Sequence, residues 1–238
     1  ARVATRNMAM SRQKKLDKME VIEKVKEKPK PEFHFREARA ASRYLFSAER
    51  LVIGYEEPLS RPISFVMERG EKLVLTGANG IGKTTLLKTI IGLIPALSGK
   101  VVPGDYLYQG YFEQEMTGAK NNTCIEELWC EYPSWTQYEI RIALAKCGLT
   151  TKHIESQVRV LSGGEQAKVR LCKLMNRETN FLLLDEPTNH LDVEAKEELK
   201  RSLTEYGGSI LLICHEPDFY EGFATRVIDG RSWTLKLS

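Results

Sequence analysis

Apolar residues in this chain gather in short, nearly continuous runs, a pattern typical of strands buried in a sheet. Helical patterns separate these runs, one directly after Gly82 and others over residues 121–180. Strands that alternate with helices predict an α/β domain. The predicted strands are at Phe33 and Phe35, from Tyr44 to Ile53, at Ile63–Met67 and Lys72–Thr76, and, as buried parallel strands, at Phe181–Leu184 and Ile210–Cys214.

The N-terminal segment has a different pattern. Residues 8–28 are rich in good helix formers, with Lys and Glu around a narrow apolar stripe, so they predict one helix. Pro29 and Pro31 end it. The stripe consists of Leu16, Met19, Ile22 and Val25.

Composition adds a division by charge. The 238 residues are 42% hydrophobic and 28% charged, which permits a sizeable core and excludes wholesale disorder. The net charge of +3 is the sum of +7 in residues 1–50 (14 Lys/Arg, 7 Asp/Glu) and −4 in the rest (21 Lys/Arg, 25 Asp/Glu). Two interpretations of the basic segment stay open: a solvated helix lying on the domain or a helical partner, which charge alone favours, and a basic arm facing phosphates.

The five cysteines, at positions 124, 130, 147, 172 and 214, form no CxxC pair. Because the sequence also has no signal peptide, we interpret them as reduced thiols of a cytosolic protein. No run approaches the ~20 apolar residues that a membrane helix needs. The chain starts at Ala1 rather than methionine, so we expect a longer parent chain, although processing or the choice of expressed segment would also explain this start.

Residues 77–84, GANGIGKT, fit the pattern GxxxxGK[ST] between the apolar run KLVLT and the helical run TTLLKTIIGL. This is the context that a phosphate-binding loop requires. Glycines let successive backbone N–H groups turn toward phosphate oxygens, and the helix N-terminus adds partial positive charge. The predicted contacts are Gly77, Asn79, Gly80 and Gly82 along the loop, Lys83 to the β- and γ-phosphates, Thr84 through its hydroxyl to Mg²⁺, and Thr85 to the α-phosphate.

Two carboxylates, Asp185 and Glu186, end the apolar run Phe181–Leu184. At the C-terminal end of a buried strand, Asp185 can reach the magnesium ion, usually through water, and Glu186 can act as general base. Apolar runs often end in charged turns, so this interpretation depends on the phosphate loop at residues 77–84.

The segment LSGGEQ, residues 161–166, by itself indicates only a capped helix start. Between a phosphate loop and a strand that ends in DEPT, it resembles the signature of ATP-binding cassette (ABC) ATPases. The resemblance implies that Ser162, Gly163 and Gly164 contact the γ-phosphate of an ATP molecule held by an opposite cassette.

Other elements of the ABC pattern follow in order. By this resemblance, Gln114 in YFEQE senses magnesium and water, and His215 after ILLIC contacts the γ-phosphate, so both join Glu186 as catalytic candidates. Asp192, in NHLD, matches the loop that crosses the cassette interface. Tyr55 matches the residue that stacks on adenine, while a core or strand tyrosine remains the alternative.

Two features resemble the ABC-F branch, whose members carry two cassettes in one chain and no membrane domain. They are DEPTNHLD at residues 185–192 and the basic N-terminal segment, which resembles the end of the linker between the cassettes. On this resemblance, residues 1–40 are the basic linker helix and its Pro-rich link. Residues 41–238 are then an α/β P-loop cassette with a mixed core sheet, an antiparallel β subdomain and a helical subdomain at about 116–178.

The sequence departs from the branch after the switch histidine, where Glu216 and Pro217 replace the usual aspartate and arginine. Glu216 keeps the charge, but Pro217 removes a backbone donor, which leaves the local hydrogen bonding open. Thr84 replaces the commoner serine and retains the hydroxyl for magnesium.

The resemblance implies a cytoplasmic ATPase, using ATP and Mg²⁺, that acts on the ribosome as a translation factor or a ribosome-protection protein of the antibiotic-resistance type. The linker would approach ribosomal RNA and tRNA, which favours the basic-arm interpretation. The partner cassette would be the first nucleotide-binding domain of the same parent chain or a second copy, so a lone cassette should turn over weakly. Two alternatives are the nucleotide-binding subunit of a membrane ABC transporter, with residues 116–160 facing a coupling helix, and an ATP-dependent clamp with little hydrolysis.

Overall fold

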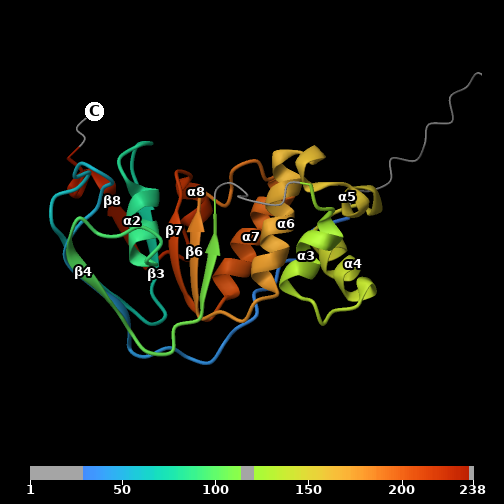
Figure 1. The fold of residues 1–238 in the computed structure, drawn as a ribbon, viewed down its shortest axis with the longest axis horizontal. Coiled ribbons are helices and arrows are strands. Elements are labelled where there is room, and N and C mark those ends of the chain that lie inside the picture. Colours follow the sequence, from blue (N-terminus) through green and yellow to red (C-terminus); the bar gives the residue numbers. More distant parts are fainter. Residues whose placement is uncertain (1–28, 114–120, 236–238) are drawn as a thin grey trace, which may run out of the picture.

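The computed structural model describes residues 29–113 and 121–235. The predicted linker helix at residues 8–28 and Gln114 lie outside the described residues. The described strands form a five-stranded sheet of order β5-β6-β7-β3-β8 and a three-stranded sheet of order β2-β1-β4 (Figure 1). The strands are β1 (Tyr44–Val52), β2 (Ile63–Glu68), β3 (Lys72–Thr76), β4 (Ser98–Pro103), β5 (Gln109–Phe112), β6 (Phe181–Asp185), β7 (Ser209–Ile213) and β8 (Arg226–Asp229).

The larger sheet is parallel in every described pairing, so the expectation of a mixed core sheet is wrong in this detail. Antiparallel pairing is confined to the smaller sheet, where β1 pairs with β2 and β4. The α/β class and the separate antiparallel sheet are confirmed. The parallel arrangement brings the C-terminal ends of β3, β6 and β7 to one edge of the sheet.

Alternate side chains of the parallel strands enter two apolar clusters, one on each face. Leu182 and Leu184 of β6 pack with helices α6 (Gly163–Met175) and α7 (Val193–Glu205). Phe181 and Leu183 point to the other face, where β1 and helix α2 (Lys83–Ile90) cover the sheet. Burial on both faces explains why these strands read as continuous apolar runs.

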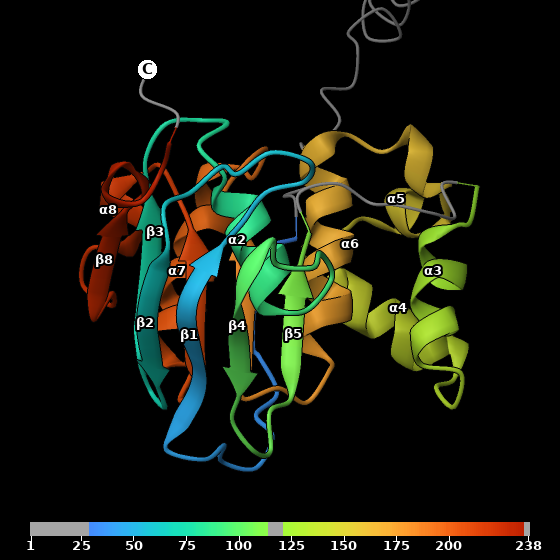
Figure 2. The same cartoon turned by 60° about the vertical axis from the view of Figure 1, so that its left-hand side comes forward.

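The antiparallel sheet covers the α2 face of the parallel sheet (Figure 2). Phe46 of β1 joins the two sheets, because its ring centroid lies 6.1 Å from that of Phe181 in β6 and 5.4 Å from that of Phe65 in β2. Leu73 and Leu75 of β3 belong to the same cluster. Val74 of the same strand belongs to the cluster on the opposite face, so the strand that precedes the phosphate loop is packed on both faces.

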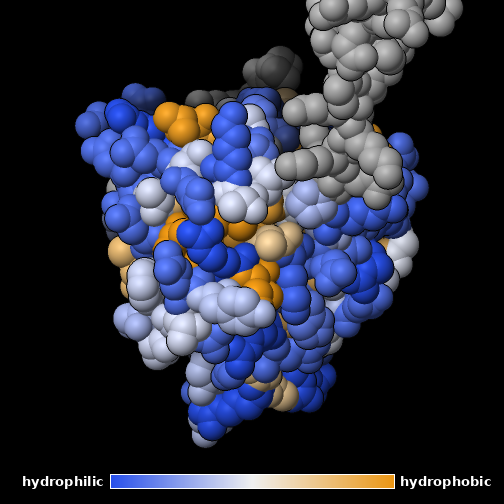
Figure 3. All heavy atoms as spheres, turned by 90° about the vertical axis from the view of Figure 1, so that its right-hand side faces the viewer, coloured by the Kyte–Doolittle hydropathy of each residue, from blue (hydrophilic) through white to orange (hydrophobic). Residues whose placement is uncertain are grey.

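The region predicted as mainly helical is helical in its described part. Its elements are α3 (Cys124–Glu131), α4 (Gln137–Lys146), α5 (Thr151–Glu155), a 3-10 turn (Val158–Val160) and α6. Thr123, Thr136 and Ser162 each begin a helix with a reciprocal capping box, which satisfies backbone donors that a helix start leaves open. Figure 3, viewed from the side of these helices, shows a mainly hydrophilic face with a small hydrophobic strip.

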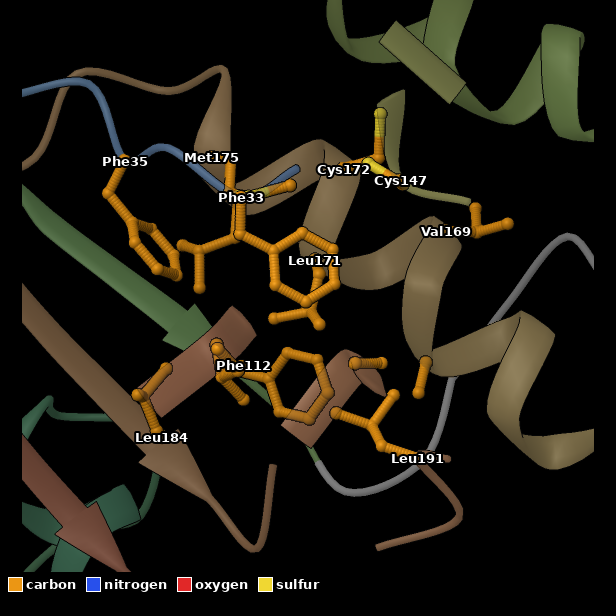
Figure 4. Packing of buried hydrophobic residues seen from close by; sticks show 14 of the residues in the cluster. Phe33, Phe35, Phe112, Cys147, Val169, Leu171, Cys172, Met175, Leu184 and Leu191 are labelled. Atoms are coloured by element: carbon orange, nitrogen blue, oxygen red, sulfur yellow. The ribbon is translucent and has the colours of Figure 1, made fainter. Parts of the chain in front are cut away.

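Phe33 and Phe35 do not form the predicted strand. They lie in an extended segment that pairs with the chain just before β6 through an isolated parallel bridge between Glu37 and Thr179. Both rings are buried, and Figure 4 shows them beside α6 residues such as Leu171. The segment packs against helices and not along a strand. The side chains of Phe33 and Phe35 therefore enter the core although the segment forms no ladder of strand hydrogen bonds. The boundary between the linker and the cassette, near residue 40, stays a prediction.

Two short helical elements complete the C-terminal part of the chain. Helix α8 (Pro217–Tyr220) follows β7, and a 3-10 turn (Gly230–Ser232) follows β8. Among the described residues, no helix has the length and apolar character that crossing a membrane requires.

Candidate functional site at the carboxyl edge of the parallel sheet

The glycine-rich segment forms a loop between β3 and α2, as its motif predicts. Gly77, Gly80 and Gly82 have φ angles of 123°, 79° and 99°, a left-handed conformation that favours glycine. A Cβ atom on Gly77 would lie 2.5 Å from Ile81 Cδ1, so a larger residue would displace the loop. The Lys83 ammonium donates hydrogen bonds to the carbonyls of Gly77 and Ala78, each at 2.8 Å. The carbonyls of the loop thus hold the Lys83 ammonium in place.

A cavity of about 490 Å³ opens above this loop. Tyr55 is 66% exposed at the cavity, which excludes the alternative of a core tyrosine. The volume lies within the range of cavities that hold small organic ligands. The lining residues come from the loop, from α2 and from the segments after β1 and β6: Tyr55, Leu59, Asn79, Gly80, Gly82, Lys83, Thr84, Thr85 and Glu186.

Asp185 ends β6 with a buried carboxylate that is only 1% exposed. Neither carboxylate oxygen has a hydrogen-bond partner of good geometry among the described residues. Burial raises the pKa of this carboxyl group, while Thr84 and the nearby lysines act in the opposite direction. Burial likewise lowers the pKa of the Lys83 ammonium, opposed by Glu186 and Asp185.

These donors fit a magnesium ion. Mg²⁺ prefers oxygen ligands and is commonly held by one or two carboxylates or hydroxyls together with water and phosphate oxygens. Thr84 offers a hydroxyl beside the Asp185 carboxylate, and the two unpartnered oxygens of Asp185 have unused acceptor capacity. Gln114, the third predicted ligand, lies outside the described residues.

Glu186 follows Asp185 in a left-handed conformation with φ 48°, which is uncommon for a residue with a side chain. Its carboxylate Oε1 lies 3.2 Å from His215 Nε2, and its Oε2 accepts a hydrogen bond from Asn189 Nδ2 at 2.5 Å. The backbone N–H of Glu186 donates to the Ile213 carbonyl at 3.0 Å, which ties this turn to the end of β7. The structure therefore brings Glu186 and His215 together, as sequence analysis expected of two catalytic candidates.

Ser162, Gly163 and Gly164 do not line the cavity. Ser162 caps α6, which confirms the capped helix start that the segment indicates on its own. The glycines lie against His190, where a Cβ atom on Gly164 would be 2.5 Å from the His190 carbonyl oxygen. The signature segment is thus packed on the loop after Glu186, outside the cavity that holds Lys83.

Pro217 stands at a position where the lack of a backbone N–H breaks no helical hydrogen bond. It occupies the first turn of α8, a position at which proline is favoured because the N–H there has no partner within the helix. Glu216 accepts hydrogen bonds from Lys196 Nζ at 2.9 and 2.8 Å, which lower the pKa of its carboxyl group. The departure from the branch pattern therefore leaves His215 beside Glu186.

Sequence reasoning missed two residues of this region. Leu59 lines the cavity beside Tyr55, and no motif marks it. Asn189 contacts Glu186, and its spacing of three residues from Glu186 is a signal that sequence reasoning could have used, because residues three apart can close a turn.

A glycine-rich loop at a helix N-terminus, beside two strand-terminal carboxylates, defines a P-loop nucleotide-binding protein of the α/β class. Comparison with known families makes this more specific, since the family described as ABC transporter matches residues 60–189. The chain therefore belongs to the ATP-binding domains of the ABC transporter family and is an ATP-binding cassette.

Similar proteins include members of the F family. The chain is 68% identical over 237 residues to the uncharacterized ABC transporter ATP-binding protein YfmM of Bacillus subtilis, covering 100% of this chain and 46% of that protein. It is 35% identical over 239 residues to ABC transporter F family member 2 of Arabidopsis thaliana, covering 98% of this chain and 35% of that protein. The chain thus spans less than half the length of these relatives.

The fold also matches solved cassettes. One is an ATP-binding cassette whose structure is dimeric, in a post-hydrolysis state bound to ADP and Pi. The TM-score is 0.66 with 19% sequence identity, over 78% of this chain and 94% of that chain. At this identity the likeness shows the shared fold.

The position of Tyr55 leads to a prediction about nucleotide affinity. Replacing Tyr55 with Ala should weaken ATP binding by roughly fivefold, because an aromatic stacking partner contributes about 1 kcal/mol. Tyr55→Trp should preserve binding, and Tyr138→Ala, which removes a 72% exposed tyrosine of α4, is the matched control. Fluorescence titration with a labelled ATP analogue measures all three. Equal affinities for Tyr55→Ala and Tyr138→Ala would remove Tyr55 from the site.

Proposed function

We propose that this chain binds ATP with Mg²⁺ in the cavity above the phosphate loop and hydrolyses it to ADP and phosphate. The observation that supports this most is that three separate segments of the chain meet at one sheet edge. Lys83 begins α2 after the loop that follows β3, Asp185 and Glu186 stand at the end of β6, and His215 follows β7. Lys83 and Glu186 line the same cavity. Positioning and charge neutralisation are the main requirements of phosphoryl transfer.

Each group has a defined part in this proposal. Lys83 and the loop N–H groups hold the phosphates, and Thr84 with Asp185, joined by Gln114, would hold the Mg²⁺, which neutralises phosphate charge when bound. Glu186 takes a proton from water as the water oxygen bonds to the γ-phosphorus, and the bond from that phosphorus to the bridging oxygen breaks, leaving ADP with the electron pair. His215 supports the same γ-phosphate.

A second cassette completes the site in this proposal. Ser162, Gly163 and Gly164 lie outside the cavity that they would otherwise serve, which fits a role toward the nucleotide of a partner. The partner is the first cassette of a longer chain or a second copy, and the greater length of the relatives supports the former. A single cassette carries half of each composite site, so its turnover alone should be weak.

Beyond ATP hydrolysis, the proposed role of the protein is action on the ribosome in the cytoplasm. It would serve there as a translation factor or as a protein that protects ribosomes from antibiotics. This role rests on the resemblance to the ABC-F branch and on relatives named as F family members. The basic residues 1–50, with 14 Lys/Arg against 7 Asp/Glu, suit the phosphate backbone of RNA. All five cysteines are free, in keeping with a reducing compartment.

Glu186→Gln tests the hydrolytic role. The substitution keeps the shape of the side chain and removes the proton acceptor, so ATP should bind with unchanged affinity while phosphate release falls by about a hundredfold or more. The measurement pairs nucleotide titration with a single-turnover assay of phosphate release. Glu194→Gln, on the first turn of α7, is the matched control. Phosphate release at the unaltered rate in the Glu186 variant would exclude Glu186 as general base.

Co-sedimentation tests the proposed partner. With ATP present, the chain should pellet with purified bacterial ribosomes, and pelleting should fall steeply as salt rises, because phosphate contacts release counterions. Replacing Lys14, Lys15 and Lys18 with Glu should reduce pelleting severalfold and leave ATP binding unchanged. Pelleting with membrane vesicles and not with ribosomes would contradict this proposal and favour the nucleotide-binding subunit of a transporter.

A further inference from the structure

The Glu186 carboxylate has a partner to which neither motif nor resemblance assigns a role. Its Oε1 faces His215, and its Oε2 accepts from the Asn189 side-chain amide at 2.5 Å. A side-chain amide is a neutral donor, so it can hold a carboxylate oxygen without adding the positive charge of a lysine or arginine. The Asn189 contact is therefore suited to orienting the Glu186 carboxylate.

A backbone turn places the Asn189 amide. The N–H of Asn189 donates to the Glu186 carbonyl at 3.1 Å, closing a turn over residues 186–189. Glu186 itself occupies the left-handed region with φ 48°, and its own N–H is held by the Ile213 carbonyl of β7. Backbone hydrogen bonds thus fix the positions of both Asn189 and Glu186, independently of the contact between their side chains.

The rest of the loop is anchored to helix α6. His190, next to Asn189, has φ 67° and packs closely on Gly163 and Gly164. Asp192 caps α7 by accepting from the Ala195 N–H at 2.9 Å. Its other carboxylate oxygen accepts from Lys168 Nζ of α6 at 2.8 Å. Asn189 therefore cannot drift from Glu186 without disturbing contacts that hold the loop on both sides.

We propose that Asn189 is a positioning residue that sets the orientation of the Glu186 carboxylate for hydrolysis. Binding Oε2 fixes the rotation of the carboxyl group and turns Oε1 toward His215, so that one defined oxygen accepts the proton of the attacking water. The inference rests on the proposed role of Glu186 as general base. It adds that the base is oriented from the loop that packs against the signature glycines Gly163 and Gly164.

The test is a comparison of kinetic constants in the full 238-residue chain with Mg–ATP. Asn189→Ala should lower kcat by about tenfold to a hundredfold with KM within about twofold, since a misoriented base loses rate rather than binding. Asn189→Asp keeps the size of the side chain but replaces the donor with an acceptor, so it should be slower still. Asn189→Gln retains the amide on a longer side chain and should recover a substantial part of the lost rate.

Controls separate this inference from the proposed function. Glu194→Gln should leave both constants unchanged, and thermal melting of every variant should show the same midpoint as the unaltered chain. Unchanged kcat in Asn189→Ala, or an effect confined to KM, would overturn the positioning role. If Glu186→Gln abolishes hydrolysis and Asn189→Ala does not alter it, only this inference fails. If Glu186→Gln hydrolyses ATP normally, Glu186 is not the general base, and that part of the proposed function fails together with this inference.

Discussion

The register of three parallel strands is the constraint on which the candidate site depends. Val74, Leu184 and Leu212 belong to adjacent strands β3, β6 and β7, in which Leu184 pairs with Leu212 and Leu212 with Val74. Because all three strands run in the same direction, the segments that follow them emerge at one edge. The phosphate loop, the Asp185–Glu186 pair and His215 are these following segments. A shift of one residue in any strand would send its apolar side chains to the wrong face and displace the group that follows it.

At this edge the fold places charges where water is scarce. Asp185 is buried with neither oxygen in a hydrogen bond of good geometry, while Lys83 is held by loop carbonyls. Burial raises the pKa of the Asp185 carboxyl and lowers the pKa of the Lys83 ammonium, so it disfavours the charged form of each. An arrangement of this kind favours a ligand that brings both a cation and anionic oxygens, as Mg–ATP does. The strained conformation of Glu186 is retained because the backbone of β7 and the Asn189 turn hold it.

Elements of the fold were predictable where burial on two faces produces an unbroken apolar run, as in β6 and β7. Three strands escaped prediction for physical reasons. β4 is largely exposed, β5 contains Gly110 packed closely under Leu174 of α6, and β8 is a short edge strand. Phe33 and Phe35 share the alternation of a strand yet pack across helices, a tertiary arrangement that periodicity does not distinguish. In the site, motif spacing identified the phosphate loop and Glu186, and the family resemblance identified His215. Leu59 and Asn189 were missed because they take part through tertiary contacts that neither the motifs nor the resemblance marked.

A crystal structure of the chain with Mg²⁺ and a non-hydrolysable ATP analogue is the most direct test of this site. We expect the triphosphate inside the loop of residues 77–84 and the adenine against Tyr55. We also expect Mg²⁺ on the Thr84 hydroxyl, with Asp185 bound to it directly or through one water molecule. A nucleotide bound elsewhere, or a metal ion with Asp185 outside both of its coordination shells, would contradict this assignment of the site.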